Sequence, residues 1–193
     1  MNLELDTATH TYRFNGAVVP SVTQVLSPLE DFSMVRPDVL EAARQFGQHV
    51  HIACDLFNRG ELEWSTLDVS LVPYVEAWKQ FIDESGAVVI ASEFRVFHEQ
   101  LGYAGSPDCA LAWGKRIVIP DIKSTAIVPR TVGAQTAAYA EAYRAMHGAK
   151  PDRYCIQLQP GRYKTHPRKD PADWSLFLSA LNCYRFKEKH RVS

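Results

Sequence analysis

Hydrophobic and polar residues recur along this chain with two different periods, which predict helices and strands in turn. Between Pro37 and Asn58 the apolar side chains return every three or four residues, the period of an amphipathic helix. The same period over 71–82 predicts a second helix, which ends at Gly86. A third helix is predicted over 131–147. Each of these helices is expected to bury one face against a sheet.

Segments rich in β-branched and aromatic residues predict strands over 87–97, 103–113 and 116–123. A fourth strand is predicted over 152–159 (DRYCIQLQ), and the pair Asp170-Pro171 is expected to cap and begin the last helix. The order is helix, three strands, helix, strand. This order predicts an α/β or α+β fold with one central mixed β-sheet flanked by helices.

The N-terminal part of the chain carries two local signals. Asn15-Gly16 lies between strand-like segments and predicts a tight hairpin. Ser21 and Gln24 have the spacing of a capping box, which predicts a short helix that ends near Pro28.

Length and composition fit one soluble domain. The chain has 193 residues, 46% of them hydrophobic and 22% charged, with a net charge of −1. We expect an N-terminal hairpin and helices over 1–86, a core over about 87–160, and a basic segment with a helix over 161–193. No apolar run reaches the roughly 18 residues of a membrane span, and no signal-peptide pattern opens the chain. We therefore expect no membrane association and a cytoplasmic location.

The four cysteines are scattered along the chain and form no C-x-x-C pair. This pattern disfavours a zinc ribbon or a redox motif and is typical of reduced thiols in a cytosol. Each is expected to be a small buried apolar residue. They are Cys54, Cys109, Cys155 and Cys183.

Two aspartates lie within strand-like sequence in the stretch SPDCALAWGKRIVIPDIKS, residues 106–124. Gly114-Lys115 has the form of a two-residue hairpin loop. The register of such a hairpin places Asp108 opposite Asp121, with Cβ atoms about 5 Å apart. Lys123 follows two residues later and so shares the face of Asp121. A three-residue loop would break this register.

Paired carboxylates in a half-buried sheet repel each other and lose hydration, so they need a cation between them. A divalent ion with oxygen ligands, Mg²⁺ or Mn²⁺, meets this need, and Lys123 could then orient a water molecule or bind a phosphate oxygen. The alternative is an ion pair of Asp121 with Lys123, next to an unrelated surface residue, Asp108.

These residues carry a resemblance to a known superfamily. G-S-P-D at 105–108, followed by D-I-K at 121–123, resembles the signature of the PD-(D/E)xK nucleases. Segments 43–51 (ARQFGQHVH) and 135–143 (QTAAYAEAY) are similar to motifs of its RecB-like exonuclease branch. Segment 19–27 (VPSVTQVLS) resembles phage exonucleases and the mitochondrial genome-maintenance exonuclease family. The resemblance implies a restriction-endonuclease-like core.

The resemblance also implies a metal site. His51, Asp108, Asp121 and the carbonyl of Ile122 would hold one or two Mg²⁺ or Mn²⁺ ions, with Lys123 as the catalytic lysine. A lone inward histidine is often only a satisfied core residue, so that alternative stays open for His51. Its neighbour two residues earlier on the helix, His49, would point away from the site.

Three further residues are candidates for the catalytic machinery. Glu93 could be a supporting carboxylate or half of a surface ion pair. Gln135 and Tyr139 share one helix face and could hold the scissile strand or orient the catalytic lysine. Their alternative is a surface glutamine beside a packed tyrosine.

Basic residues gather toward the end of the chain, where residues 144–193 contain 11 Lys/Arg and 4 Asp/Glu. Arg162, Lys164, His166 and Arg168 stand at alternating positions and would share one strand face, where the basic side chains could contact phosphates. A solvated sheet edge is the alternative. Ser124, directly after the D-I-K motif, is a further candidate for DNA contact.

The resemblance implies a metal-dependent exonuclease that acts on single- or double-stranded DNA ends and leaves 5′-phosphates. Phage or bacterial recombination or repair is the implied setting, with a recombination or single-strand-binding protein as a candidate partner. Some relatives bind an iron–sulfur cluster, but only Cys183 lies near the end here, so we expect none. The alternatives are a restriction or junction-resolving endonuclease and a catalytically silent nucleic-acid-binding module.

Overall fold

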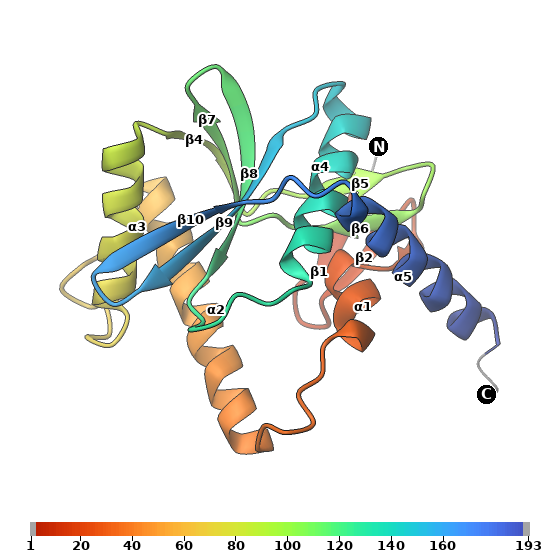
Figure 1. The fold of residues 1–193 in the computed structure, drawn as a ribbon, viewed down its shortest axis with the longest axis horizontal. Coiled ribbons are helices and arrows are strands. Elements are labelled where there is room, and N and C mark those ends of the chain that lie inside the picture. The colour runs from red at the N-terminus through yellow and green to blue at the C-terminus, as the bar shows by residue number, and fades with distance from the viewer. Residues whose placement is uncertain (1–2, 191–193) are drawn as a thin grey trace.

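A five-stranded sheet with the order β10-β9-β8-β7-β4 lies at the centre of the computed structural model, which describes residues 3–190 (Figure 1). β8 and β9 are parallel, whereas the other neighbouring strands are antiparallel. The sheet is therefore mixed, which confirms the expected fold class. Its strands are β4 (Val88–Ser92), β7 (Cys109–Trp113), β8 (Arg116–Lys123), β9 (Asp152–Gln159) and β10 (Arg162–Pro167).

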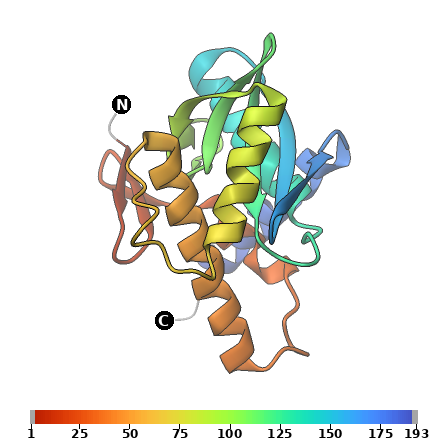
Figure 2. The same cartoon turned by 90° about the vertical axis from the view of Figure 1, so that its left-hand side faces the viewer.

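Helices cover both faces of this sheet (Figures 1 and 2). Ile122 of β8 packs in one core with Trp78 and Phe81, whereas Ile119 packs in another with Phe177. Successive side chains of a strand point to opposite faces, so β8 supplies both cores. The first face is covered by α2 (Pro37–Arg59) and α3 (Val72–Ser85), and the second by α4 (Val132–His147) and α5 (Ala172–Lys189). None of the helices described in residues 3–190 is long and apolar enough to span a bilayer.

The N-terminal segment forms a small antiparallel sheet of β1 (Leu3–Asp6), β2 (Thr11–Phe14) and β3 (Ala17–Val19). The turn between β2 and β3 contains Asn15 and Gly16, both with positive φ, as a tight hairpin turn requires. This confirms the predicted hairpin.

The predicted capping box opens α1 (Val22–Leu26). The backbone N–H of Gln24 donates to Ser21 Oγ at 3.0 Å, and the N–H of Ser21 donates to Gln24 Oε1 at 2.9 Å. The short 3₁₀ helix η1 (Ser27–Leu29) follows directly and contains the proline that was expected to end the helix.

The long strands expected over 87–97 and 103–113 are each divided, so this prediction was wrong. Their other halves, β5 (Val96–His98) and β6 (Tyr103–Gly105), pair with each other outside the central sheet. Glu93 has a φ of 45°, which turns the chain out of the sheet after β4. Pro107, between β6 and β7, cannot donate a ladder hydrogen bond. Residue propensities detect strand character but not these bends.

Two further expectations need correction near the end of the chain. The last helix begins at Ala172, one residue later than expected, although Asp170 Oδ1 does accept a hydrogen bond from the N–H of Ala172 at 2.8 Å. Three cysteines are buried as expected, but Cys183 is exposed. It lies on α5, of which the core covers only one side.

The contact between Gly105 and α4 gives a prediction about stability. A Cβ at Gly105 would lie 2.5 Å from Tyr139 Cε1, so Gly105→Ala forces the buried ring to move. We expect this overpacking to lower the free energy of unfolding by about 1–3 kcal/mol, measured by urea denaturation. Gly47→Ala is the matched control in the middle of α2, because its Cβ would meet nothing closer than 3.7 Å. The control should gain about 0.5–1 kcal/mol from helix propensity. Equal stabilities of the two variants would contradict the prediction.

Candidate active site

Asp108 lies at a place where the central sheet is open. β7 pairs with β8 only as far as Leu111 with Val118, so the following part of β8 has no strand neighbour on that side. The carboxylate of Asp108 takes the place of a strand there, because Oδ2 accepts a hydrogen bond from the N–H of Ile122 at 2.6 Å. The prediction that Asp108 pairs directly with Asp121 across the ladder was therefore wrong, although the two aspartates do interact electrostatically.

His51 of α2 approaches the other oxygen of this carboxylate. Its Nδ1 lies 2.9 Å from Asp108 Oδ1. Burial opposes ionisation of Asp108, but the charge and hydrogen bond of His51 outweigh it, so the pKa of Asp108 lies below its usual value. For the same reason the pKa of His51 is raised, although its burial alone would lower it. His49 is exposed, so only one of the two histidines faces the site, as expected.

Asp121 and Lys123 form the second charged pair of the site, and both project from β8. Lys123 Nζ lies 2.9 Å from Asp121 Oδ2 and 3.1 Å from Oδ1. Burial raises the pKa of Asp121, as does the charge of Asp108, and Lys123 offsets only part of this. Burial lowers the pKa of Lys123, but the two aspartates raise it more, so the ammonium stays charged. The site therefore brings two carboxylates and two basic groups together.

Glu93 lies beside this cluster and has an unusual backbone. Its positive φ is rare for a residue with a long side chain and costs conformational energy. Its N–H donates to the carbonyl of Asp108 at 2.8 Å. Burial of the carboxyl group and the charge of Asp108 raise the pKa of Glu93 to about 7. Glu93 forms no ion pair with any residue in 3–190, so the geometry favours a supporting carboxylate over half of a surface pair.

Gln135 and Tyr139 border the site from α4, on the other face of the sheet from α2, which carries His51. Gln135 Nε2 donates to the hydroxyl of Tyr139 at 3.4 Å, and burial holds the pKa of that hydroxyl well above its usual value. Both residues line a cavity of about 150 Å³ that Asp108 lines as well. The hydroxyl groups of Tyr12 and Ser106, 2.8 Å apart, line the same cavity.

The sequence analysis did not assign a role to Tyr12 or to Ser106. Ser106 lies two residues before Asp108, so its place in the G-S-P-D segment was an available signal. Tyr12 lies in β2, and only the packing of the N-terminal sheet against β5 and β6 brings it to the cavity. No sequence pattern points to it.

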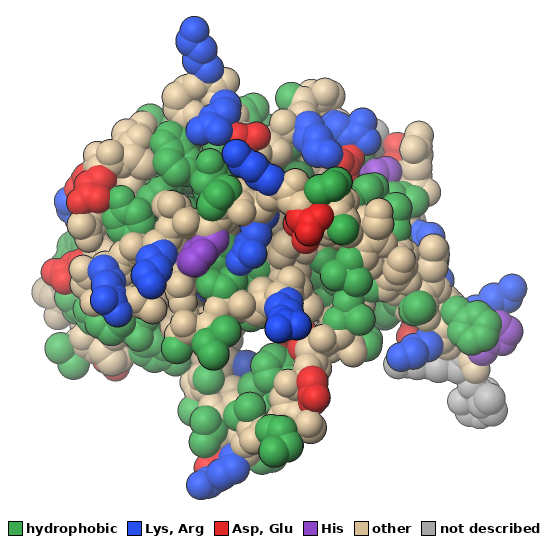
Figure 3. Space-filling view, viewed as in Figure 1, with side chains coloured by type: hydrophobic (Ala, Val, Ile, Leu, Met, Phe, Trp, Pro, Cys, Tyr) green, Lys and Arg blue, Asp and Glu red, His purple; other side chains and the backbone are tan. Residues whose placement is uncertain are grey.

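Two of the residues expected to contact DNA, Arg162 and Lys164, lie on the same face of the sheet as Asp121 and Lys123. The ladders place Lys123, Gln157 and Lys164 in one row across β8, β9 and β10, so their side chains share a face. Arg162 lies two residues away on β10 and is exposed. Several basic side chains are visible over β9 and β10 in Figure 3. Ser124, directly after β8, has its hydroxyl close to Gly47 of α2.

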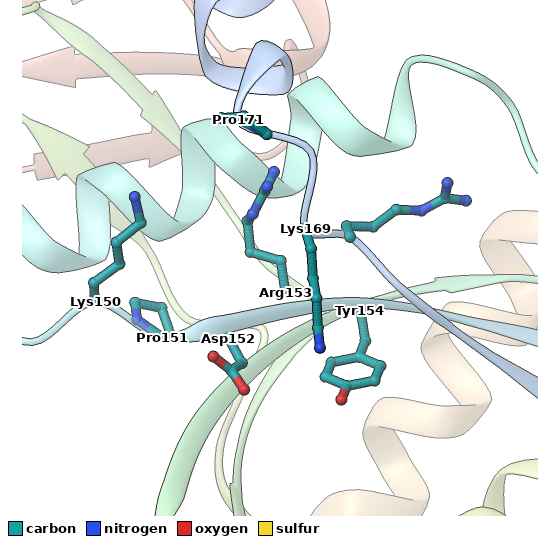
Figure 4. A pocket seen from close by; sticks show the side chains of 8 residues that line it. Lys150, Pro151, Asp152, Arg153, Tyr154, Lys169 and Pro171 are labelled. Atoms are coloured by element: carbon teal, nitrogen blue, oxygen red, sulfur yellow. The ribbon is translucent and has the colours of Figure 1, made fainter.

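A cavity of about 450 Å³ lies away from the acidic cluster, at the start of β9 (Figure 4). Lys150, Arg153, Arg168 and Lys169 line it, and Figure 4 shows Lys169 extending toward the ring of Tyr154. Arg168 Nε is buried and has no hydrogen-bond partner in residues 3–190. Asp152 also lines this cavity, but its carboxylate is paired with Arg116 at 2.7 Å. The buried carboxylates of the described residues meet at Asp108 and Asp121 instead, so we place the candidate site there.

The charged cluster has suitable donors for a hard divalent ion. Asp121 Oδ2 is buried without a hydrogen bond, although Lys123 Nζ lies nearby, and Asp108, Asp121 and His51 offer oxygen and imidazole nitrogen atoms. Asp121 Oδ2 has the Lys123 ammonium beside it at 2.9 Å but no hydrogen bond of good geometry, so a lone pair is left for a metal ion. In residues 3–190, no three acidic, histidine or cysteine side chains already converge on one point, because the carboxylates are turned toward Lys123 and His51. Binding an ion would require these side chains to turn away from Lys123 and His51. The role of the Ile122 carbonyl stays a prediction.

Comparisons with known proteins identify related structures but no family. The sequence matches no protein-family profile and no curated protein. A crystal structure of a candidate exonuclease from Eubacterium rectale is similar with a TM-score of 0.51 and 11% identity, over 74% of this chain and 65% of that one. A crystal structure of an alkaline exonuclease from Laribacter hongkongensis is similar with a TM-score of 0.40 and 15% identity, over 88% and 91%.

The chain spans only 65% of the length of the Eubacterium rectale protein. At 11% identity the similarity shows the mixed α/β fold alone. Any activity has to be argued from the side chains of the site.

The raised pKa of Glu93 gives a prediction about pH and stability. Its unperturbed pKa is 4.5, so between pH 4.5 and about 7 the unfolded chain releases a proton that the folded chain keeps. Stability therefore falls with rising pH in this window, and Glu93→Gln removes that fall. We expect the melting temperature of the wild type, minus that of the variant, to decrease from pH 4.5 to 7 in EDTA and then to level off. Glu93 as a whole is exposed although its carboxyl group is desolvated by the site, so solvent screening reduces the size of the effect but not its sign. A constant difference across this window would contradict the assignment.

Proposed function

We propose that this protein is a divalent-metal-dependent deoxyribonuclease that hydrolyses phosphodiester bonds, most simply as an exonuclease on DNA ends. The observation that carries the proposal is the cluster of Asp108, Asp121, Lys123 and His51 on the open side of β8. The similarity of the fold to that of one candidate exonuclease is consistent with it. Single- and double-stranded ends are both candidate substrates, in phage or bacterial DNA recombination or repair in the cytoplasm.

In the proposed mechanism Asp108 and Asp121, with His51 and the carbonyl of Ile122, would hold one or two Mg²⁺ or Mn²⁺ ions. The bound ion would supply an activated water molecule and stabilise negative charge at the phosphorus. Lys123, which the aspartates keep protonated, would donate to an oxygen of the scissile phosphate or position the water. Attack by water would release the 3′ oxygen and leave a 5′-phosphate.

The neighbouring side chains would position the substrate around these groups. Glu93 would support the acidic ligands, and Gln135 and Tyr139 would orient the scissile strand through the cavity that Asp108 shares with them. Arg162 and Lys164 would contact phosphates from their shared face of the sheet, and Arg168 from the basic cavity that it lines. Ser124 would contact a phosphate next to Lys123, which it follows directly. A recombination or single-strand-binding protein is the proposed partner.

Removal of the lysine gives a prediction about activity. Lys123→Ala should lower kcat by about 100- to 1,000-fold, because one donor to the developing charge is lost. The assay is Mg²⁺- or Mn²⁺-dependent loss of end-labelled linear DNA, with EDTA as the metal-free control. Lys115→Ala, at the exposed tip of the β7–β8 hairpin, should keep wild-type activity.

A covalently closed circle separates the alternative functions in the same assay. Resistance of the circle is expected for an exonuclease, whereas its cleavage would favour a restriction or junction-resolving endonuclease. Binding without cleavage of any DNA would overturn the mechanism and favour a silent nucleic-acid-binding module.

The basic residues of β10 give a prediction about DNA binding. The double variant Arg162→Ala/Lys164→Ala should bind DNA more weakly in EDTA, with a salt dependence that is shallower by about 1.5 in the slope of log K against log [salt]. The charge-matched control Lys79→Ala/Lys115→Ala changes residues on α3 and on the hairpin tip. An unchanged slope in the first variant would mean that β10 is only a solvated edge.

A further inference from the structure

The loop that follows Lys123 is held by a side chain from the neighbouring strand. The parallel ladder of β8 with β9 ends at the pair of Lys123 and Gln157. Beyond it, Gln157 Nε2 donates to the carbonyl of Thr125 at 2.8 Å and to that of Ala126 at 2.9 Å. The side chain of Gln157 therefore continues the pairing for the next residues, where the backbone ladder has stopped.

The orientation of this amide follows from its partners. Two carbonyl oxygens face one end of it, and only an NH₂ group can donate to both. The other end, Oε1, then faces His166 Nε2 at 3.1 Å. An oxygen accepts, so this ring nitrogen must carry the proton. The hydrogen bond from His166 of β10 therefore supports the amide orientation that the two loop carbonyls require.

This amide is buried and its donors are fully used. Gln157 is 4% exposed. Both N–H groups and the oxygen have partners, so replacing it leaves two loop carbonyls without donors in a buried place. Gln159, two residues later on β9, differs, because its Oε1 is buried and has no partner in residues 3–190. Gln159 is therefore a chemically matched residue without the same link to the loop.

The held loop borders the proposed reaction site on two sides. It begins with Ser124, directly after Lys123, and the Ser124 hydroxyl lies next to Gly47, one helical turn before His51 on α2. The loop also leads into α4, which carries Gln135 and Tyr139. A displacement of the loop would therefore change the position of the lysine relative to the other groups.

We propose that Gln157 is a positioning residue of this nuclease site, which holds the loop after Lys123 through its amide, and that a hydrogen bond from His166 supports the orientation of that amide. The proposal rests on the function proposed above. Gln157 contacts neither substrate nor ion in this role, and acts by keeping Lys123 and Ser124 in place. Misplacement of a reacting group by about 1 Å can cost about 100-fold in rate.

The test combines kinetics with hydrogen exchange. Gln157→Glu removes both donors and places a carboxylate against two carbonyls. We expect kcat on linear DNA to fall at least about 10-fold, with KM within about twofold of the wild type. We also expect faster amide exchange of residues 124–128 in the metal-free protein. Gln159→Glu, the control with the same charge change on the same strand, should leave the exchange of this loop and the kcat unchanged.

Two substitutions of His166 test the same link to the loop without changing Gln157. His166→Gln keeps an N–H donor toward Gln157 Oε1 and should retain wild-type kcat and loop exchange. His166→Glu offers only an acceptor at neutral pH, so it favours a flipped amide and should reproduce the effects of Gln157→Glu. This comparison remains informative if Gln157→Glu fails to fold.

The results separate this inference from the proposed function. Loop exchange that is unchanged in His166→Glu and in Gln157→Glu would overturn the inference, whatever the activity. So would faster exchange with an unchanged kcat, because the loop would then be held without consequence for the reaction. A wild type that cleaves no DNA in Mg²⁺ or Mn²⁺ would instead overturn the proposed function and, with it, the catalytic part of the inference.

Discussion

The burial of two carboxylates at an open side of β8 is the constraint on which the rest of the structure depends. Asp121 is only 2% exposed, and a buried carboxylate is costly unless a positive charge or hydrogen bonds compensate it. Lys123 compensates Asp121, and His51 with the N–H of Ile122 compensates Asp108. These contacts join α2, β7 and β8 at one point. The packing that keeps these elements together therefore also determines the geometry of the site.

The fold makes this concentration of charge tolerable because a single strand carries both apolar core residues and charged site residues. β8 places Ile119 and Ile122 in the two apolar cores, whereas Asp121 and Lys123 lie at its C-terminal end, beyond the last pairing with β7. On β9, Gln157 neighbours Lys123 and binds the loop that follows it. The apolar cores stabilise the positions of charged groups that contribute little stability themselves. Reactive charged groups in proteins are commonly held in unfavourable surroundings by the packing around them.

Local signals in the sequence were sufficient for much of the architecture. The hairpin at Asn15-Gly16 and the capping box of Ser21 depend on neighbouring residues only, and both are present. The helices were predicted from apolar periodicity, and the hairpin register from its two-residue loop, which is correct from Trp113 to Leu111. The divided strands were missed, because the turn at Glu93 is a backbone conformation that residue propensity does not encode.

The sequence by itself determined which chemical groups the site contains: two aspartates, a lysine two residues after the second, and a histidine on one face of a helix. Only the tertiary structure decided how they meet. Asp108 faces a backbone N–H of β8 and not Asp121, because the ladder ends early, and Tyr12 and Gln157 reach the region through contacts between distant segments. Spacing along a strand is set by the geometry of the chain itself, whereas contacts between elements depend on how the whole core packs.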